Sequence, residues 1–125
     1  MNDGVKVSPL KLIGQNDDGS TFGLSSKSTG EFLLAFRNAG TISGKHFHKG
    51  LSFQKIPEVF ILIEGELELY YKNLKTSVEK CITVKAPAKV DVYPYIWHEI
   101  KALTTITFLE LCSLKEHEQD TFYKY

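Results

Sequence analysis

GTISGKHFHKGLSFQKIPEVFILIEG, residues 40–65, is the stretch from which the rest of the chain is interpreted. It holds His46 and His48, two of the four histidines, and then Glu58, which opens an apolar run ending at Gly65. Alternate side chains of a β-strand point to the same side, so two histidines one residue apart project together. The stretch therefore predicts two strands joined by a loop, with a pair of imidazoles on the first strand.

Short strand-like runs dominate the sequence on both sides of this stretch. They are rich in Val, Ile, Thr, Tyr and Phe and are separated by Gly, Pro, Asn or Lys, and no helical period with caps precedes the tail. The step from Glu64 to Gly65 predicts a tight hairpin. We therefore expect an all-β fold, a sandwich or barrel, with a short helix or an extended arm at the end of the chain.

The length of the chain and its lack of a linker predict a single domain over residues 1–125. Residues 1–30 are rich in turn formers and predict a loop with an edge strand near residues 5–12 or 21–24. Residues 31–113 form the expected barrel core, which opens with a buried strand, EFLLAFR. Residues 114–125 are the expected tail.

The charge balance narrows the classes of partner. Fifteen basic and fifteen acidic residues cancel, which gives no electrostatic reason to expect nucleic acid or an anionic membrane. No apolar run is long enough to span a bilayer, and the N-terminus lacks the apolar core of a signal peptide. The two cysteines, Cys81 and Cys112, are therefore expected to be reduced, and the cytoplasm is the expected location.

The phase of the strands predicts which polar side chains face inward. His98 shares a strand face with Ile100 and Ala102, opposite a glutamate and a lysine that belong in water. His46 and His48 share a face with Gly44 and Ile42, opposite two lysines. In the last strand-like run, Glu110 shares a face with Ile106 and Phe108, which predicts a second inward carboxylate.

Three inward histidines and a glutamate in one small barrel favour a ligand site over histidines satisfied by core hydrogen bonds, because an inward glutamate is costly unless it is paired or metal-bound. Such a nitrogen and oxygen set suits divalent Fe, Mn, Ni, Zn or Cu. His117 lies in a polar stretch and is expected to be a solvated surface residue.

These residues resemble the motifs of the cupin superfamily. Gly40, His46, His48, Glu58 and Gly65 are similar to the first cupin motif, although the nine residues between His48 and Glu58 form a longer loop than usual. YPYIWHEIKAL, residues 93–103, resembles the second motif. Over residues 31–113 the resemblance implies a jelly-roll barrel whose metal ligands are His46, His48, Glu58 and His98.

A second resemblance points to one branch of this superfamily. The elements DDGSTF, HFHK, PYIWHE and EQDTFYKY are similar to the layout of nucleotide-sugar 3,4-ketoisomerases and 3,5-epimerases. The resemblance implies an enzyme without metal, whose histidines move protons next to a ketone. Those enzymes typically lack the glutamate that stands here as Glu58, so this residue favours the metal centre.

Three functions follow as hypotheses. The first is a metal centre that binds or transforms a small oxygen-bearing molecule, the second a metal-independent nucleotide-sugar isomerase, and the third a sensor of a small ligand or metal without catalysis. His46, His48 and Glu110 are the candidate catalytic residues. By proximity in sequence, the candidate pocket walls are Phe36, Phe60, Tyr93, Tyr95 and Trp97.

A homodimer is also expected. Small cupins commonly pair, and Phe47 is predicted to point outward, which would leave an apolar side chain to be covered. The apolar run over residues 59–63, which is apolar on both of its faces, gives a second physical reason to expect an interface.

Overall fold

The computed structural model describes residues 3–28 and 30–125 and confirms the expected all-β fold with a short C-terminal helix. The elements in chain order are β1 (Val5–Pro9), β2 (Lys11–Asn16), β3 (Gly19–Gly23), β4 (Leu33–Arg37), β5 (Ile42–His46), β6 (Glu58–Glu64), β7 (Glu66–Asn73), β8 (Glu79–Lys85), β9 (Ala88–Val92), β10 (Ile96–Ala102), β11 (Ile106–Glu110) and α1 (Leu114–Gln119). Within the described residues, no helix has the length and apolar character needed to cross a membrane.

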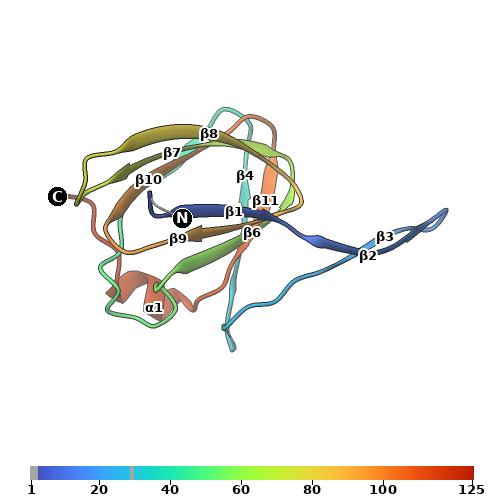
Figure 1. Cartoon of the computed structure of the whole chain (residues 1–125), viewed down its shortest axis with the longest axis horizontal. Helices are drawn as coiled ribbons and strands as arrows, with labels where there is room; N and C mark the ends of the chain where they lie inside the picture. Colours follow the sequence, from blue (N-terminus) through green and yellow to red (C-terminus); the bar gives the residue numbers. More distant parts are fainter. Residues whose placement is uncertain (1–2, 29) are drawn as a thin grey trace.

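Two antiparallel sheets face one another and enclose the core (Figure 1). One sheet has the order β1-β9-β6-β11-β4, and the other has the order β5-β10-β7-β8. The inward side chains of both sheets form one apolar cluster, as expected for a sandwich whose strands alternate between core and solvent. The prediction of a hairpin at Gly65 was wrong: β6 and β7 belong to different sheets and do not pair, so the chain makes a tight turn there from one sheet to the other. The positive φ of Gly65, 93°, explains why glycine stands in this turn.

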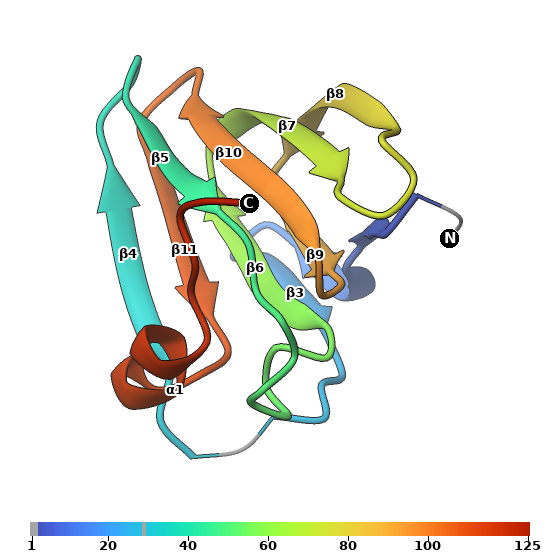
Figure 2. The same ribbon diagram turned by 90° about the vertical axis from the view of Figure 1, so that its left-hand side faces the viewer.

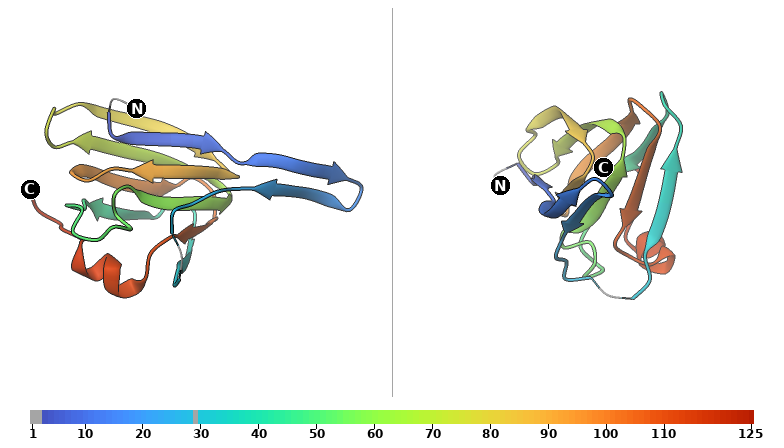
Figure 3. Two further views of the ribbon diagram at one scale, coloured as in Figure 1. Left: turned by 60° about the horizontal axis from the view of Figure 1, so that its bottom comes forward. Right: turned by 90° about the vertical axis from the view of Figure 1, so that its right-hand side faces the viewer.

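The first thirty residues hold more strand than expected. β1 is the edge strand of the five-stranded sheet, and it pairs with β9. β2 and β3 form a separate two-stranded hairpin, which projects from the end of the barrel (Figure 3). The turn residues Asp17 and Asp18 join its two strands, so the turn pattern marked the tip of a hairpin rather than a loop.

The prediction of a buried strand at EFLLAFR was wrong. β4 is an edge strand that pairs only with β11, and only one of its faces turns toward the interior. Leu34 and Phe36 lie on the other face and are exposed. The apolar run therefore indicated that this segment forms a strand, but it did not indicate how deeply the strand is buried.

A bulge in β5 changes the phase that the sequence predicted. Glu99 pairs with Gly44 and His98 pairs with His46, so Lys45 is an extra residue on β5. His46 is buried as expected, but Ile42 is half exposed on the other side of the bulge. Before the bulge, Ser43, which pairs with Ile100, points inward, and Ile42 does not.

The tail folds back over the barrel as α1 and an extended segment (Figure 2). Ser113 and Glu116 form a capping box that starts the helix. Beyond it, Phe122 exchanges backbone hydrogen bonds with Phe47 and lies against its ring. Phe47 is only 3% exposed because the tail covers it, so it leaves no apolar surface for a second subunit to cover.

Candidate functional site

Both sheets contribute to a buried polar site at one end of the barrel. His46 on β5 stands directly opposite His98 on β10, because these two strands are in register there. His48 follows β5, and Glu58 begins β6 on the facing sheet. The four side chains are buried, and one ligand atom of each lies within 4.8 Å of the others. We call these four residues the His/Glu cluster.

Backbone carbonyls fix a hydrogen on Nδ1 of two imidazoles. His48 Nδ1 lies 2.6 Å from the Asp120 carbonyl oxygen, and His98 Nδ1 lies 2.9 Å from that of Ile96. A carbonyl oxygen only accepts, so each Nδ1 carries a hydrogen. Both Nε2 atoms then point at Oε2 of Glu58, from 2.7 Å and 3.2 Å. Each contact needs a proton or a shared cation, since a neutral Nδ1–H imidazole offers only a lone pair at Nε2.

A lysine that the sequence analysis did not single out completes the surroundings of Glu58. Lys55 is fully buried in the long loop between β5 and β6, and its Nζ lies 3.3 Å from Oε1 of Glu58. Burial by itself would raise the pKa of Glu58, but the charges and hydrogen bonds of His48 and Lys55 hold that pKa well below its usual range. Burial likewise opposes the charge on Lys55, but the Glu58 carboxylate leaves its pKa raised.

A second group of potential ligand atoms adjoins the first. Glu110, Cys112 and His117 lie within 4.8 Å of one another through one ligand atom each. His117 Nδ1 accepts from Lys55 Nζ at 3.0 Å and lies 3.7 Å from Oε2 of Glu110. The prediction that His117 is a solvated surface residue was therefore wrong. Burial, and then the Lys55 charge, lower its pKa to about 4, while burial raises the pKa of Cys112 to about 11.

A cavity of about 200 Å³ opens beside both groups and is called the barrel cavity here. Burial and the neighbouring His98 lower the pKa of His46 to about 2, so this imidazole is neutral at neutral pH. Burial and the neighbouring Glu58 raise the pKa of Glu110 to about 7. The residues lining the barrel cavity are Arg37, Ser43, Gly44, His46, Glu58, Phe60, His98, Ile100, Phe108, Glu110, His117 and Tyr123.

The structure brings only part of the predicted pocket wall to the barrel cavity. Phe60 lines it, whereas Phe36, Tyr93, Tyr95 and Trp97 do not. Phe36 is 63% exposed on the outer face of β4, and Tyr93 packs against the apolar core. Tyr95 lies against the ring of Phe47, and Trp97 against that of Tyr125. Nearness in sequence misplaced these aromatics because alternate residues of a strand leave on opposite faces.

Arg37 and Tyr123 line the barrel cavity without having been predicted to do so. Arg37 is the only arginine of the chain, and a lone arginine at the end of a strand-like run was the signal available for it. Tyr123 comes from the tail, and its ring packs edge-on against His46 at a centroid distance of 5.9 Å. No local pattern predicts that contact, because it depends on where the tail docks.

Asp120 ties the tail to the His/Glu cluster. It is fully buried at the C-terminal cap of α1, and its carboxylate accepts from the backbone N–H groups of Lys49, Gly50 and Ser52. Its carbonyl accepts from His48 Nδ1. Asp120 therefore fixes the start of the long loop through its carboxylate, and it fixes the Nδ1 hydrogen of His48 through its carbonyl.

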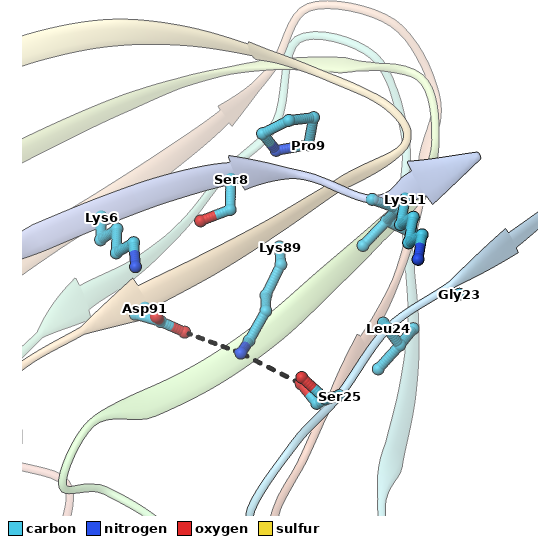
Figure 4. Close-up of a pocket in the computed structure, with 10 residues that line it drawn as sticks. Lys6, Ser8, Pro9, Lys11, Gly23, Leu24, Ser25, Lys89 and Asp91 are labelled. Atoms are coloured by element: carbon cyan, nitrogen blue, oxygen red, sulfur yellow. Dashed lines mark hydrogen bonds and ion pairs between the residues drawn. The ribbon is translucent and has the colours of Figure 1, made fainter. Parts of the chain in front are cut away.

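A larger cleft of about 460 Å³ lies outside the barrel, beside β1, β9 and the segment after β3 (Figure 4). Lys89 bridges it by donating to the Ser25 carbonyl oxygen, and its Nζ lies 4.0 Å from the Asp91 carboxylate. None of the residues that line this cleft is a histidine. Size alone therefore does not identify the chemically active site.

No protein family model matches the chain, and no curated protein matches it by sequence. Solved structures do. The chain is similar to QdtA, a sugar 3,4-ketoisomerase from Thermoanaerobacterium thermosaccharolyticum in complex with TDP, with a TM-score of 0.78 and 22% identity over 100% of this chain and 91% of that one.

Two further solved structures belong to the same group of enzymes. A 3,4-ketoisomerase from Helicobacter canadensis gives a TM-score of 0.74 and 16% identity over 99% of this chain and 93% of that one. A dTDP-4-dehydrorhamnose 3,5-epimerase from Bacillus anthracis, with TDP and PPi bound, gives 0.66 and 17% over 90% of this chain and 75% of that one. These matches, together with the paired sheets, confirm the resemblance at the level of the fold: the chain has the cupin fold of the sugar 3,4-ketoisomerases and 3,5-epimerases.

Proposed function

We propose that the protein is a metal-independent isomerase or epimerase that moves a proton next to the ketone of a nucleotide-linked sugar. The observation that carries the proposal is the contrast between the two carboxyl groups of the barrel cavity. The pKa of Glu58 is held well below its usual range, whereas that of Glu110 is raised to about 7. Two acids with opposite shifts at one site supply a fixed charge and a proton carrier.

Glu110 and His46 are the proposed proton-transfer groups. A group with a pKa near 7 both takes up and releases a proton at neutral pH, which suits general acid–base catalysis. His46 lines the same cavity with a neutral imidazole. His48 does not line it and is held between the Asp120 carbonyl and Glu58, so its proposed role is to position Glu58.

The chemistry needs no redox partner. A base removes the proton from the hydroxyl-bearing carbon next to the ketone, and the electron pair moves toward the carbonyl to give an enediol. Returning a proton to the former carbonyl carbon, with the hydroxyl proton released, moves the ketone by one carbon. Returning it to the original carbon from the other side inverts that centre instead. Both outcomes use the same pair of proton carriers.

Arg37 supports a substrate that carries phosphate. It is the one arginine of the chain, and it lines the barrel cavity, where a guanidinium can bind phosphate oxygens in bidentate fashion. The cavity, about 200 Å³, is smaller than usual drug-sized sites. The sugar ring would therefore lie inside, with the phosphates near Arg37 and the nucleoside outside. The similar structures bound to TDP or to a TDP-sugar support the same class of substrate.

Proton exchange tests this function directly. Tag-free protein is incubated in D₂O with TDP-4-keto-6-deoxyglucose, and NMR follows deuterium entering the carbon next to the ketone. We expect exchange in the wild type and a loss of about 100-fold in Glu110→Gln and in His46→Asn. Glu66→Gln, at the start of β7 and outside the barrel cavity, is the matched control and should retain the wild-type rate. Wild-type protein that neither binds nor exchanges this sugar would disprove the proposal.

A metal centre is the second candidate function, favoured by the carbonyl bonds of His48 and His98. Metal-bound histidines commonly donate their other ring N–H in this way, which leaves Nε2 free for the ion. The His/Glu cluster would hold divalent Fe, Mn, Ni, Zn or Cu, which would act as a Lewis acid on a small ligand. The donor atoms suit such an ion, but the adjacent Lys55 charge does not. Stoichiometric metal in the wild type, lost in Glu58→Ala, would favour this function over proton transfer.

A further inference from the structure

Lys55 is held in place by two acceptors. Its Nζ lies 3.3 Å from Glu58 Oε1 and 3.0 Å from His117 Nδ1, and the Cys112 thiol is also near it. An ammonium group has only donors and no acceptor, so it donates to both partners. The side chain is fully buried.

The Glu58 carboxylate has a cation beside it without a metal ion. Its Oε1 lies 3.3 Å from the Lys55 ammonium, which offsets its charge, while its Oε2 faces the two imidazoles, where a proton at Nε2 would complete the contact. A divalent ion in the His/Glu cluster would add two positive charges in a buried site, beside an ammonium group that cannot move into water and a carboxylate that is already paired with it. Burying unpaired charge is strongly unfavourable, and the repulsion between like charges is large at low dielectric constant.

We propose that Lys55 is a built-in cation that takes the place of a metal's charge at Glu58 and keeps divalent metal ions out of the His/Glu cluster. The chain thus combines the donor set of a metal-binding cupin with a side chain that opposes metal binding. This inference rests on the proposed metal-free function of the site. Its test measures metal affinity, which the proton-exchange assay does not measure, so either can fail without the other.

The loop that carries Lys55 is built to hold it inward. Lys55 belongs to the nine-residue connection between His48 and Glu58, the segment that makes this chain's first motif unusually long. The Asp120 carboxylate holds the start of the loop, and Lys27 Nζ donates to the carbonyl oxygens of Phe53 and Ile56 on either side of Lys55. The extra length therefore has a structural result, which is an ammonium group delivered to Oε1 of Glu58.

Isothermal titration of EDTA-treated, tag-free protein with Ni²⁺ alone tests the proposal. We expect Lys55→Met to bind Ni²⁺ at least about 10-fold more tightly than the wild type, because one repulsive charge has been removed. Lys55→Arg, which keeps the charge, should bind within about threefold of the wild type. Lys101→Met is the matched control, since it removes an exposed lysine from the outer face of β10 and should change little.

Thermal unfolding with and without Ni²⁺ covers the case in which Lys55→Met loses stability. The variant can have a low midpoint temperature of unfolding when it is free of metal. The proposal is supported if Ni²⁺ raises that midpoint by much more than it raises the midpoint of the wild type. Lys55→Gln, which keeps a polar donor without the charge, is the second variant. The proposal is overturned if both neutral variants bind Ni²⁺ no more tightly than the wild type, or if neither folds even with saturating Ni²⁺.

Discussion

Glu110 gives the site a pH dependence that can be measured through stability. Its pKa is raised from 4.5 to about 7 by burial and by Glu58, so between these values the folded state binds more protons than the unfolded state. The contribution of this carboxyl to stability is therefore fully present below pH 4.5 and is lost as the pH rises through 7. His117 acts in the opposite sense, because its lowered pKa favours folding above pH 6.5.

Comparison of the wild type with Glu110→Gln isolates this effect, since the histidines are common to both proteins. The free energy of unfolding of the wild type relative to the variant should fall by about 2–3 kcal/mol between pH 4.5 and 8. Urea unfolding at four pH values measures the difference. Glu118→Gln, on the exposed side of α1, is the matched control for the charge change and should not reproduce this fall. Parallel curves for the wild type and Glu110→Gln would show that Glu110 titrates normally.

Among the elements, α1 matters through the residue that caps its C-terminus. Asp120 accepts three backbone N–H groups from the long loop and fixes His48 from the other side. We expect Asp120→Ala to lower the free energy of unfolding by about 3 kcal/mol, because hydrogen bonds to a buried carboxylate are lost and three donors are left unpaired. Chemical denaturation measures this loss, and proton exchange should fall with it, because the loop loses its anchor and the tail, whose backbone carbonyl holds His48, is then fixed less firmly.

Glu118→Ala is the matched control for Asp120→Ala, since it removes an exposed carboxylate from the same helix. It should change the free energy of unfolding by no more than about 0.5 kcal/mol. Asp120→Asn keeps the shape and one acceptor oxygen, so it should fall between the two. An Asp120→Ala protein as stable as the wild type would show that the loop does not depend on the tail.

The sequence predicted the strands well because their signals are local. Alternation placed His98, Ile100 and Ala102 on one buried face of β10, and the glycine after Glu64 marked a tight turn, although that turn joins two sheets and not the strands of a hairpin. It failed for β5, where one extra residue at Lys45 reverses the phase. Gly44, an isolated glycine inside the strand with a positive φ of 87°, was the available signal for this bulge, but which residue becomes the extra one depends on the partner strand.

The sequence motifs predicted only part of the site. The four residues of the His/Glu cluster do lie together, but Lys55 and His117 reach them from a loop and a tail. The position of a loop side chain depends on tertiary contacts, here those made by Asp120 and Lys27. From the sequence alone, a single lysine in a loop is expected to be a solvated surface residue, because only the tertiary contacts show that it is buried.

At the scale of the whole molecule, the projecting β2–β3 hairpin bears on the proposed homodimer (Figure 3). An isolated two-stranded hairpin is at best marginally stable in water. This one also exposes apolar side chains, and apolar surface of that kind is commonly covered in an assembly. The exposed apolar residues of β2 and β3 and of the segment after them are Leu12, Ile13, Phe22 and Leu24.

We therefore expect the protein to be a dimer in solution, with a mass of twice 14.2 kDa by light scattering coupled to size exclusion. Ile13→Asp, which places a charge on the hairpin, should shift the equilibrium toward monomer by at least about 10-fold in Kd, because a carboxylate would have to be buried. Leu51→Asp is the matched control, an equally exposed apolar residue in the long loop, and it should leave the mass unchanged. A wild type that stays monomeric at about 100 μM would rule out the homodimer, and the hairpin would then have to be stable without a partner.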